Sequence, residues 1–140
     1  MTTRVLILCT GNSARSQMAE GLLRALGDGA FDVFSAGTKP GIVRPEAIAV
    51  MAERGIDISS HRSKHVDEFA GQRFDYVITV CDSANESCPV FPGAPQRIHW
   101  SFPDPAAVDG AETERLAAFR AVRDDLSATL ETLLRGIPLA

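Results

Sequence analysis

The feature that most constrains the fold is a wholly apolar run at residues 5–8, which small and hydroxyl-bearing residues follow directly. Continuous apolar residues are typical of a strand buried on both faces, so we predict that residues 4–9 form an interior strand of a parallel sheet. After the small residues, apolar side chains recur at helical spacing from Ala14 onward, and this helix is predicted to end at Gly27 or Gly29. The chain therefore begins as strand, loop and helix.

The same alternation continues along the chain. Strands are predicted at residues 31–36, 75–81 and 96–100, where β-branched and aromatic residues gather. Helices are predicted from Pro45 to Gly55 and along a stripe of apolar residues at 116–133, with at most one helical turn, at 66–69, in the polar stretch 59–72. Strands that alternate with helices predict an α/β fold, a four-stranded parallel sheet with helices on both faces.

Bulk composition narrows the class of protein further. A length of 140 residues with 45% hydrophobic residues predicts a single domain over residues 1–140. A net charge of -4, with no Lys/Arg cluster, argues against nucleic-acid binding. The first apolar run is too short for a signal peptide or a membrane span, so we expect a cytoplasmic monomer without a membrane partner. Three cysteines are too few for a disulfide scaffold and indicate chemistry or simple burial.

The loop after the first strand has the composition of an oxyanion site: Cys9, Thr10, Gly11, Asn12, Ser13, Ala14, Arg15 and Ser16. A tight loop that leads into a helix presents backbone N–H groups, and Arg15 adds a charged fork that suits phosphate or arsenate. The same groups favour a thiolate, so we expect a lowered pKa for Cys9, with Ser16 donating to its sulfur. The loop therefore predicts a cysteine nucleophile aimed at a bound oxyanion; the alternative is a small buried cysteine.

Two further cysteines lie downstream. Cys81 ends a predicted strand and Cys88 follows it by seven residues, a spacing that fits no common zinc motif, so no metal site is predicted. Either one is a core residue and the other incidental, or the two form a redox pair. If the residues between them are helical, their Cα atoms stand ~10 Å apart, whereas a disulfide requires about 7 Å or less. Oxidation would then rearrange this segment.

An acid lies in the proline-rich segment 101–110, which is predicted to be irregular. Asp104 stands between Pro103 and Pro105. A carboxylic acid near an oxyanion can protonate a leaving oxygen, but Asp beside Pro is also common in turns, and both readings stay open. In a parallel sheet, ligands bind beyond the carboxyl ends of the strands, where the Cys9 loop, Cys81 and Asp104 all fall.

Together these residues resemble the low-molecular-weight protein tyrosine phosphatase superfamily and, within it, the thioredoxin-coupled arsenate reductases. The likeness runs through residues 9–21 and 35–37, Cys81, Cys88-Pro89, His99-Trp100 and Asp104-Pro105.

The resemblance implies a three-cysteine relay. Cys9 attacks arsenate held by the loop and Arg15, with Asp104 as general acid. Cys81 then attacks the Cys9 sulfur and releases arsenite, and Cys88 attacks Cys81, so that thioredoxin reduces a Cys81–Cys88 disulfide. It implies no metal and no organic cofactor, because the electrons come from thioredoxin.

The chain also departs from relatives of this kind. Some relatives have a cysteine where this chain has Ala14, a position that the relay does not need. Some relatives bind a monovalent cation through the equivalents of Asn12, Glu20, Ser35 and a carboxylate; here Lys64 is expected at the last position, so we predict no dependence on potassium. The alternative function is a low-molecular-weight tyrosine phosphatase, which would hydrolyse the Cys9 phosphoryl adduct with water.

Overall fold

A four-stranded parallel sheet forms the centre of the molecule. The computed structural model describes residues 3–81, 91–93 and 95–136. The strands are β1 (Thr3–Cys9), β2 (Phe31–Gly37), β3 (Tyr76–Thr79) and β4 (Gln96–His99), in the order β2-β1-β3-β4. All neighbouring strands run parallel, and β1 lies in the middle with Val5 opposite Val33 of β2 and Tyr76 of β3. The predicted α/β fold with a parallel sheet is confirmed.

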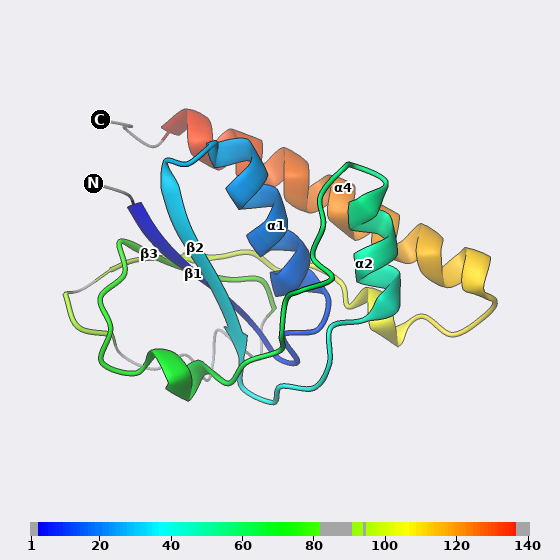
Figure 1. The fold of residues 1–140 in the computed structure, drawn as a ribbon, viewed down its shortest axis with the longest axis horizontal. Coiled ribbons are helices and arrows are strands. Elements are labelled where there is room, and N and C mark those ends of the chain that lie inside the picture. Colours follow the sequence, from blue (N-terminus) through cyan, green and yellow to red (C-terminus); the bar gives the residue numbers. More distant parts are fainter. Residues whose placement is uncertain (1–2, 82–90, 94, 137–140) are drawn as a thin grey trace.

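In the described part of the chain, three α-helices and two short 3-10 helices accompany the sheet: α1 (Arg15–Gly27), α2 (Pro45–Ala52), α4 (Glu112–Gly136), η1 (Val66–Phe69) and η2 (Pro105–Ala107). The helices α1, α2 and α4 gather along one side of the sheet, and η1 lies near the arrowhead of β2 (Figure 1). The predicted elements are present with small differences at their ends. In particular, β3 and β4 are shorter than expected.

The end of α1 differs from the prediction in one respect. The residue in the left-handed conformation directly after the helix is Asp28, with φ of 45°, and Gly29 follows with φ of 86°. Asp tolerates this conformation better than most residues, because its short polar side chain can bond locally. Gly27 serves packing instead, since a Cβ there would collide with the ring of Phe31.

The two faces of the sheet are covered differently. Phe34 lies opposite Leu6 in the register and packs tilted or edge-on against Phe69 of η1 and Phe74, at centroid distances of 5.6 and 5.9 Å. Successive strand residues alternate between faces, so Ser35 points to the other side. There it donates a hydrogen bond of 2.8 Å to Glu20 of α1. The α-helical layer and η1 therefore cover opposite faces, as predicted.

The strand order places the site. From β1 the chain moves to β2 on one side and later to β3 on the other, and a crevice opens at such a reversal beyond the carboxyl ends of the strands. Cys9 is the last residue of β1, and Cys81 follows the end of β3 by two residues. Both cysteines therefore lie at this edge. Cys88 lies outside the described residues.

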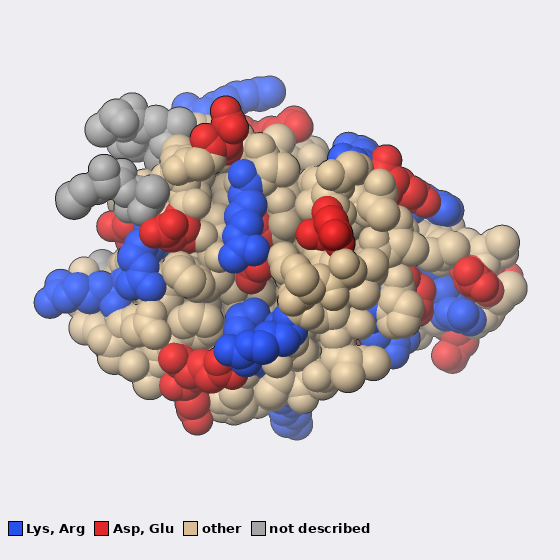
Figure 2. All heavy atoms as spheres, viewed as in Figure 1, with Lys and Arg blue, Asp and Glu red and all other residues tan. Residues whose placement is uncertain are grey.

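The distribution of charge and apolar residues does not indicate a particular binding partner. On the face seen in Figure 2, acidic and basic side chains are interspersed, and no broad basic patch forms. Within the described part of the chain, no helix has both the length and the apolar content needed to cross a membrane.

Candidate active site

The loop that follows β1 is held from outside by the segment after β2. The carbonyl groups of Thr10, Gly11 and Ser13 accept hydrogen bonds from backbone N–H groups at residues 39, 41 and 44. Gly37 is required for this contact, because a Cβ there would press on the Thr10 carbonyl and the Asn12 backbone. These three carbonyl groups on the outer side of the loop thus have hydrogen-bond partners. On the inner side, the Asn12 N–H donates to the Cys9 sulfur at 3.2 Å.

Asn12 is the centre of a hydrogen-bond chain whose direction can be worked out. It adopts a left-handed conformation, with φ of 47°, and its side chain is completely buried. The backbone N–H of Lys64 donates to its Oδ1 atom at 2.8 Å. A backbone N–H can only donate, so this bond identifies the oxygen of the amide and turns the Nδ2 group toward Ser16 and Ser35, at 2.8 and 2.9 Å.

The hydrogen bond at the nucleophile depends on this orientation. The Ser16 hydroxyl oxygen accepts from Asn12, which leaves the Ser16 hydrogen available to the Cys9 sulfur, 2.8 Å away. Ser35 also accepts from Asn12 and passes its hydrogen to the carboxylate of Glu20. A Cys9 thiolate has no hydrogen to give, so Ser16 donates to it in that state, as the sequence predicts. The resemblance already groups Ser35 with Asn12 and Glu20, whereas the bond from the Lys64 backbone depends on a tertiary contact that no local sequence pattern reveals.

Opposing influences act on the Cys9 thiol, which is 2% exposed. Burial has the largest effect and raises its pKa above the ordinary value. Hydrogen bonds from Ser16, the positive charge of Arg15 and the Asn12 N–H lower the pKa without cancelling the effect of burial. The sequence-based expectation of a lowered pKa is therefore wrong for this structure. It considered the stabilising groups but not the cost of desolvating a thiolate at the buried end of a strand.

Arg15 connects the loop to the segment that carries the acid. One terminal nitrogen donates to the carbonyl of Phe102 at 3.1 Å, and the other lies 3.9 Å from the carboxylate of Asp104. The guanidinium is largely buried, whereas the Asp104 side chain is 45% exposed. Asp104 also caps η2 by accepting from the Ala106 N–H at 3.0 Å. Asp104 therefore both stabilises a turn and lies beside the loop, so the two readings of this residue are compatible.

Cys81 contacts the loop directly. Its sulfur lies 3.3 Å from the hydroxyl oxygen of Thr10, and its side chain is buried. Cys9 and Cys81 are both free thiols. Because Thr10 directly follows Cys9 in the chain, this contact brings Cys81 to the edge of the proposed oxyanion site. The predicted pairing with Cys88 involves a residue outside the described part of the chain.

A buried carboxylate lies behind the loop and is surrounded by basic side chains. Glu20 is 2% exposed. Its oxygens lie 2.7 Å from Arg24, 3.3 Å from Nδ1 of His61 and 4.0 Å from Nζ of Lys64. Lys64 therefore stands beside Glu20, the position expected for it from the resemblance. Within residues 3–81, 91–93 and 95–136, no cluster of three or more His, Cys, Asp or Glu residues has a geometry that suits a metal ion.

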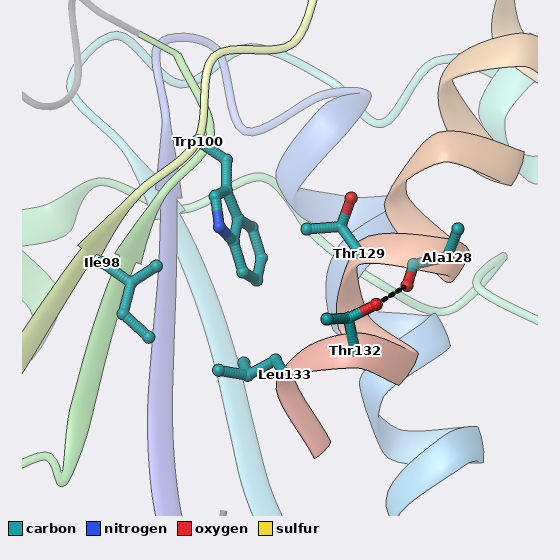
Figure 3. Close-up of a pocket in the computed structure, with 6 residues that line it drawn as sticks. All are labelled: Ile98, Trp100, Ala128, Thr129, Thr132 and Leu133. Carbon is teal, nitrogen blue, oxygen red and sulfur yellow. Dashed lines mark hydrogen bonds between the residues drawn. The ribbon is translucent and has the colours of Figure 1, made fainter. Parts of the chain in front are cut away.

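A separate apolar pocket of about 480 Å³ lies between β4 and α4 (Figure 3). Ile98, Leu133 and the indole of Trp100 form its walls. The two threonines that line it bond their hydroxyl groups to carbonyls of α4, Thr129 to Asp125 and Thr132 to Ala128. Trp100 also packs edge-on against Phe102 at 6.4 Å. None of its described lining residues is charged, and none belongs to the oxyanion loop.

Comparison with known proteins agrees with this geometry. Residues 4–138 match the family described as low molecular weight phosphotyrosine protein phosphatase. An arsenate reductase from Halalkalibacterium halodurans is 45% identical over 129 residues, which cover 91% of this chain and 92% of that protein.

Solved structures lead to the same group of proteins. An arsenate reductase in a phosphate-binding state is 34% identical, with a TM-score of 0.78 over 98% of this chain and 100% of that one. An arsenate reductase in an oxidized state gives a TM-score of 0.81 at 34% identity and the same coverage. The chain therefore belongs to the low molecular weight phosphotyrosine protein phosphatase family, among its arsenate reductases.

Proposed function

We propose that this protein reduces arsenate to arsenite with its own thiols and is restored by thioredoxin. The observation that carries the proposal is the contact between Cys81 and Thr10, because it brings a second buried thiol to the loop that holds the nucleophile. Relatives that are arsenate reductases support it. We expect the reaction to run in a monomer in the cytoplasm, where reduced thioredoxin is available.

In the first step Cys9 forms a bond to arsenic. The loop N–H groups and Arg15 bind the dianion, and the thiol proton of Cys9 passes to an arsenate oxygen. A thiol with a raised pKa can still react in this way, since the substrate itself accepts the proton. Asp104 protonates the oxygen that departs as water. Arsenic remains in its pentavalent state in the resulting thiol–arsenate adduct.

In the second step Cys81 carries out the reduction. Its sulfur attacks the Cys9 sulfur, and a disulfide between Cys9 and Cys81 forms while the sulfur–arsenic bond breaks. The electron pair of that bond stays on arsenic, which leaves as trivalent arsenite, and the Cys81 proton goes to an arsenite oxygen. The Thr10 hydroxyl is within reach to donate to the Cys81 sulfur as this sulfur loses its proton.

In the third step Cys88 regenerates the nucleophile. Its thiolate attacks the Cys81 sulfur, Cys9 leaves as a thiolate that Ser16 and the Asn12 N–H can stabilise, and a Cys81–Cys88 disulfide remains. The two thiols of thioredoxin then reduce this disulfide by exchange. None of the three proposed steps uses a metal or an organic cofactor. This step requires the Cys88 sulfur to reach the Cys81 sulfur, and we propose that it does so.

Phosphomonoester hydrolysis is the alternative, and the family to which the chain belongs favours it as a side reaction. Cys9, Arg15 and Asp104 would act on phosphate as they do on arsenate, because the two oxyanions share shape and charge. Water would then resolve the adduct, and neither Cys81 nor Cys88 would be needed.

The two functions separate by mutation. In an assay of arsenate-dependent NADPH consumption with thioredoxin and its reductase, Cys81→Ser and Cys88→Ser should each abolish multiple turnover. With arsenite measured directly, Cys88→Ser should still give one equivalent per protein and Cys81→Ser none. Retention of full reduction by both variants would exclude the relay. A glutaredoxin system in place of thioredoxin identifies the thiol donor, and p-nitrophenyl phosphate measures the hydrolytic alternative.

A further inference from the structure

The amide of Gln17, in the first turn of α1, is completely buried directly behind the oxyanion loop. Its Nε2 group lies 3.1 Å from the backbone oxygen of Asn12, 3.0 Å from the side-chain oxygen of Asn12 and 3.0 Å from the carbonyl of Arg62. Its Oε1 atom lies 2.9 Å from Nδ1 of His61. A buried amide with four contacts of this kind holds its neighbours in a fixed geometry.

The orientation of this amide is determined by its surroundings. Three acceptor oxygens face Nε2, so a reversed amide would place oxygen against oxygen three times. His61 must then donate from Nδ1. Its Nε2 atom, 3.3 Å from Arg24, accepts from that guanidinium, which has only donors. His61 is thus the neutral tautomer with hydrogen on Nδ1, consistent with burial lowering its pKa.

We propose that Gln17 is a positioning residue for the Cys9 nucleophile, because its NH₂ group binds both the backbone oxygen and the side-chain oxygen of Asn12. This double contact keeps the left-handed backbone and the side chain of Asn12 in one relative orientation. The Asn12 amide can then donate to Ser16. The Ser16 hydroxyl in turn remains available to donate to a Cys9 thiolate. His61 contributes by holding the Gln17 amide in place. The inference rests on Cys9 as the nucleophile of the proposed function.

The test measures the reactivity of Cys9 without arsenate, so that it does not depend on the reductase activity. In a Cys81→Ser/Cys88→Ser background Cys9 is the only thiol. Gln17→Met keeps the length of the side chain but removes its hydrogen bonds. We expect alkylation of Cys9 by iodoacetamide near neutral pH to slow by about threefold to tenfold, which is the loss expected for one hydrogen bond to the thiolate. The pH profile should move upward, and phosphate should protect less.

Controls separate positioning from general stability. Gln72→Met removes the bonds of Gln72 to Arg4 and to the Glu68 carbonyl, away from the loop, and should leave the alkylation profile unchanged. His61→Ala should slow alkylation in the same direction, and His61→Asn, which restores a donor near Nδ1, should recover part of the rate. Equal alkylation profiles in Gln17→Met and Gln72→Met would overturn the proposal, whatever their melting temperatures.

If Gln17→Met does not fold, two further measurements decide. Gln17→Glu has the same size but sets a carboxylate oxygen against the oxygens of Asn12; it too should slow alkylation, and a folded Gln17→Glu with the parental rate would overturn the proposal. In the parent protein, the Gln17 side-chain ¹⁵N resonance should shift when Cys9 is alkylated, whereas that of Gln72 should not. An unmoved Gln17 resonance would also exclude the coupling.

Discussion

The hydroxyl oxygen of Thr10 lies 3.3 Å from the sulfur of Cys81, so side chains 71 positions apart in the chain join the oxyanion loop to the end of β3. Thr10 contributes to the site in two ways. Its backbone carbonyl is held by the N–H of Lys39, and its side chain is directed to the second thiol. The backbone function and the side-chain function can therefore be separated experimentally.

Thr10→Val keeps the branched shape but removes the hydroxyl. We expect Cys9 to form its adduct at a nearly unchanged rate, whereas the attack by Cys81 should slow by about fivefold to tenfold, because the hydrogen bond that stabilises the Cys81 thiolate is lost. Single-turnover release of arsenite, followed by rapid quench, measures this step. Thr10→Ser, which keeps the hydroxyl, is the matched control. A slowed adduct step with a normal release step would contradict the assignment.

Asp104→Asn should lower the rate of adduct formation by about a hundredfold or more, since the variant cannot supply a proton to the departing oxygen. The amide can still accept from the Ala106 N–H, so the turn should remain. Binding of phosphate should weaken little. Asp109→Asn, an exposed acid in the same segment, is the control and should have no effect. A parental rate in Asp104→Asn would remove the residue from the mechanism.

Potassium should not affect the activity. Exchange of sodium chloride for potassium chloride at constant ionic strength tests this directly, because Arg24, His61 and Lys64 already surround the Glu20 carboxylate. Lys64→Asp should introduce a dependence, since a second carboxylate beside Glu20 needs a cation to offset it. Lys64→Met keeps the backbone N–H and should not respond. A rise in the parental rate on adding potassium would refute the prediction.

The carboxylate of Glu53 should make stability depend on pH below the ordinary range of Glu. Hydrogen bonds from Arg120 and Arg123 hold its pKa at about 2, compared with 4.5 for an ordinary Glu. A lowered pKa means that the folded state binds the proton less tightly than the unfolded state. The stabilisation is therefore complete above about pH 4.5 and is lost as the pH falls toward 2.

Glu53→Gln should consequently lower the urea midpoint at neutral pH and flatten its decline in acid. Circular dichroism across this pH range measures both effects. Glu131→Gln, an exposed residue on α4, should leave the curve unchanged. An equal decline in the parent and Glu53→Gln would show that other carboxylates determine the acid transition.

The fold follows closely from local patterns in the sequence. The unbroken apolar residues of β1 indicate a strand covered on both sides, and the spacing from Ala14 onward indicates the helix behind it. These patterns also place Cys9, Cys81 and Asp104 at one edge of the sheet. Arg15 was expected to bind the oxyanion because its guanidinium offers a charged, two-donor fork that suits phosphate or arsenate.

Other parts of the site were not predictable because they depend on long-range contacts. The bond from the Lys64 backbone to Asn12 joins residues 52 positions apart, and no local pattern records it. Gln17 has the sequence context of an ordinary helix residue. The pKa of Cys9 was expected to fall because the nearby donors are visible in the sequence, whereas the depth of burial that outweighs them is a property of the fold.

Position 64 divides two tasks between its backbone and its side chain. The N–H orients Asn12, while the ammonium group balances Glu20. Every amino acid except proline supplies that N–H, so nearly any substitution at 64 would leave the donor to Asn12 in place while it changes the charge beside Glu20. A substitution at position 64 can therefore replace the lysine ammonium group by a bound metal cation without changing the hydrogen bond that orients Asn12 near Cys9. Proline is the one residue at this position that would disturb both functions.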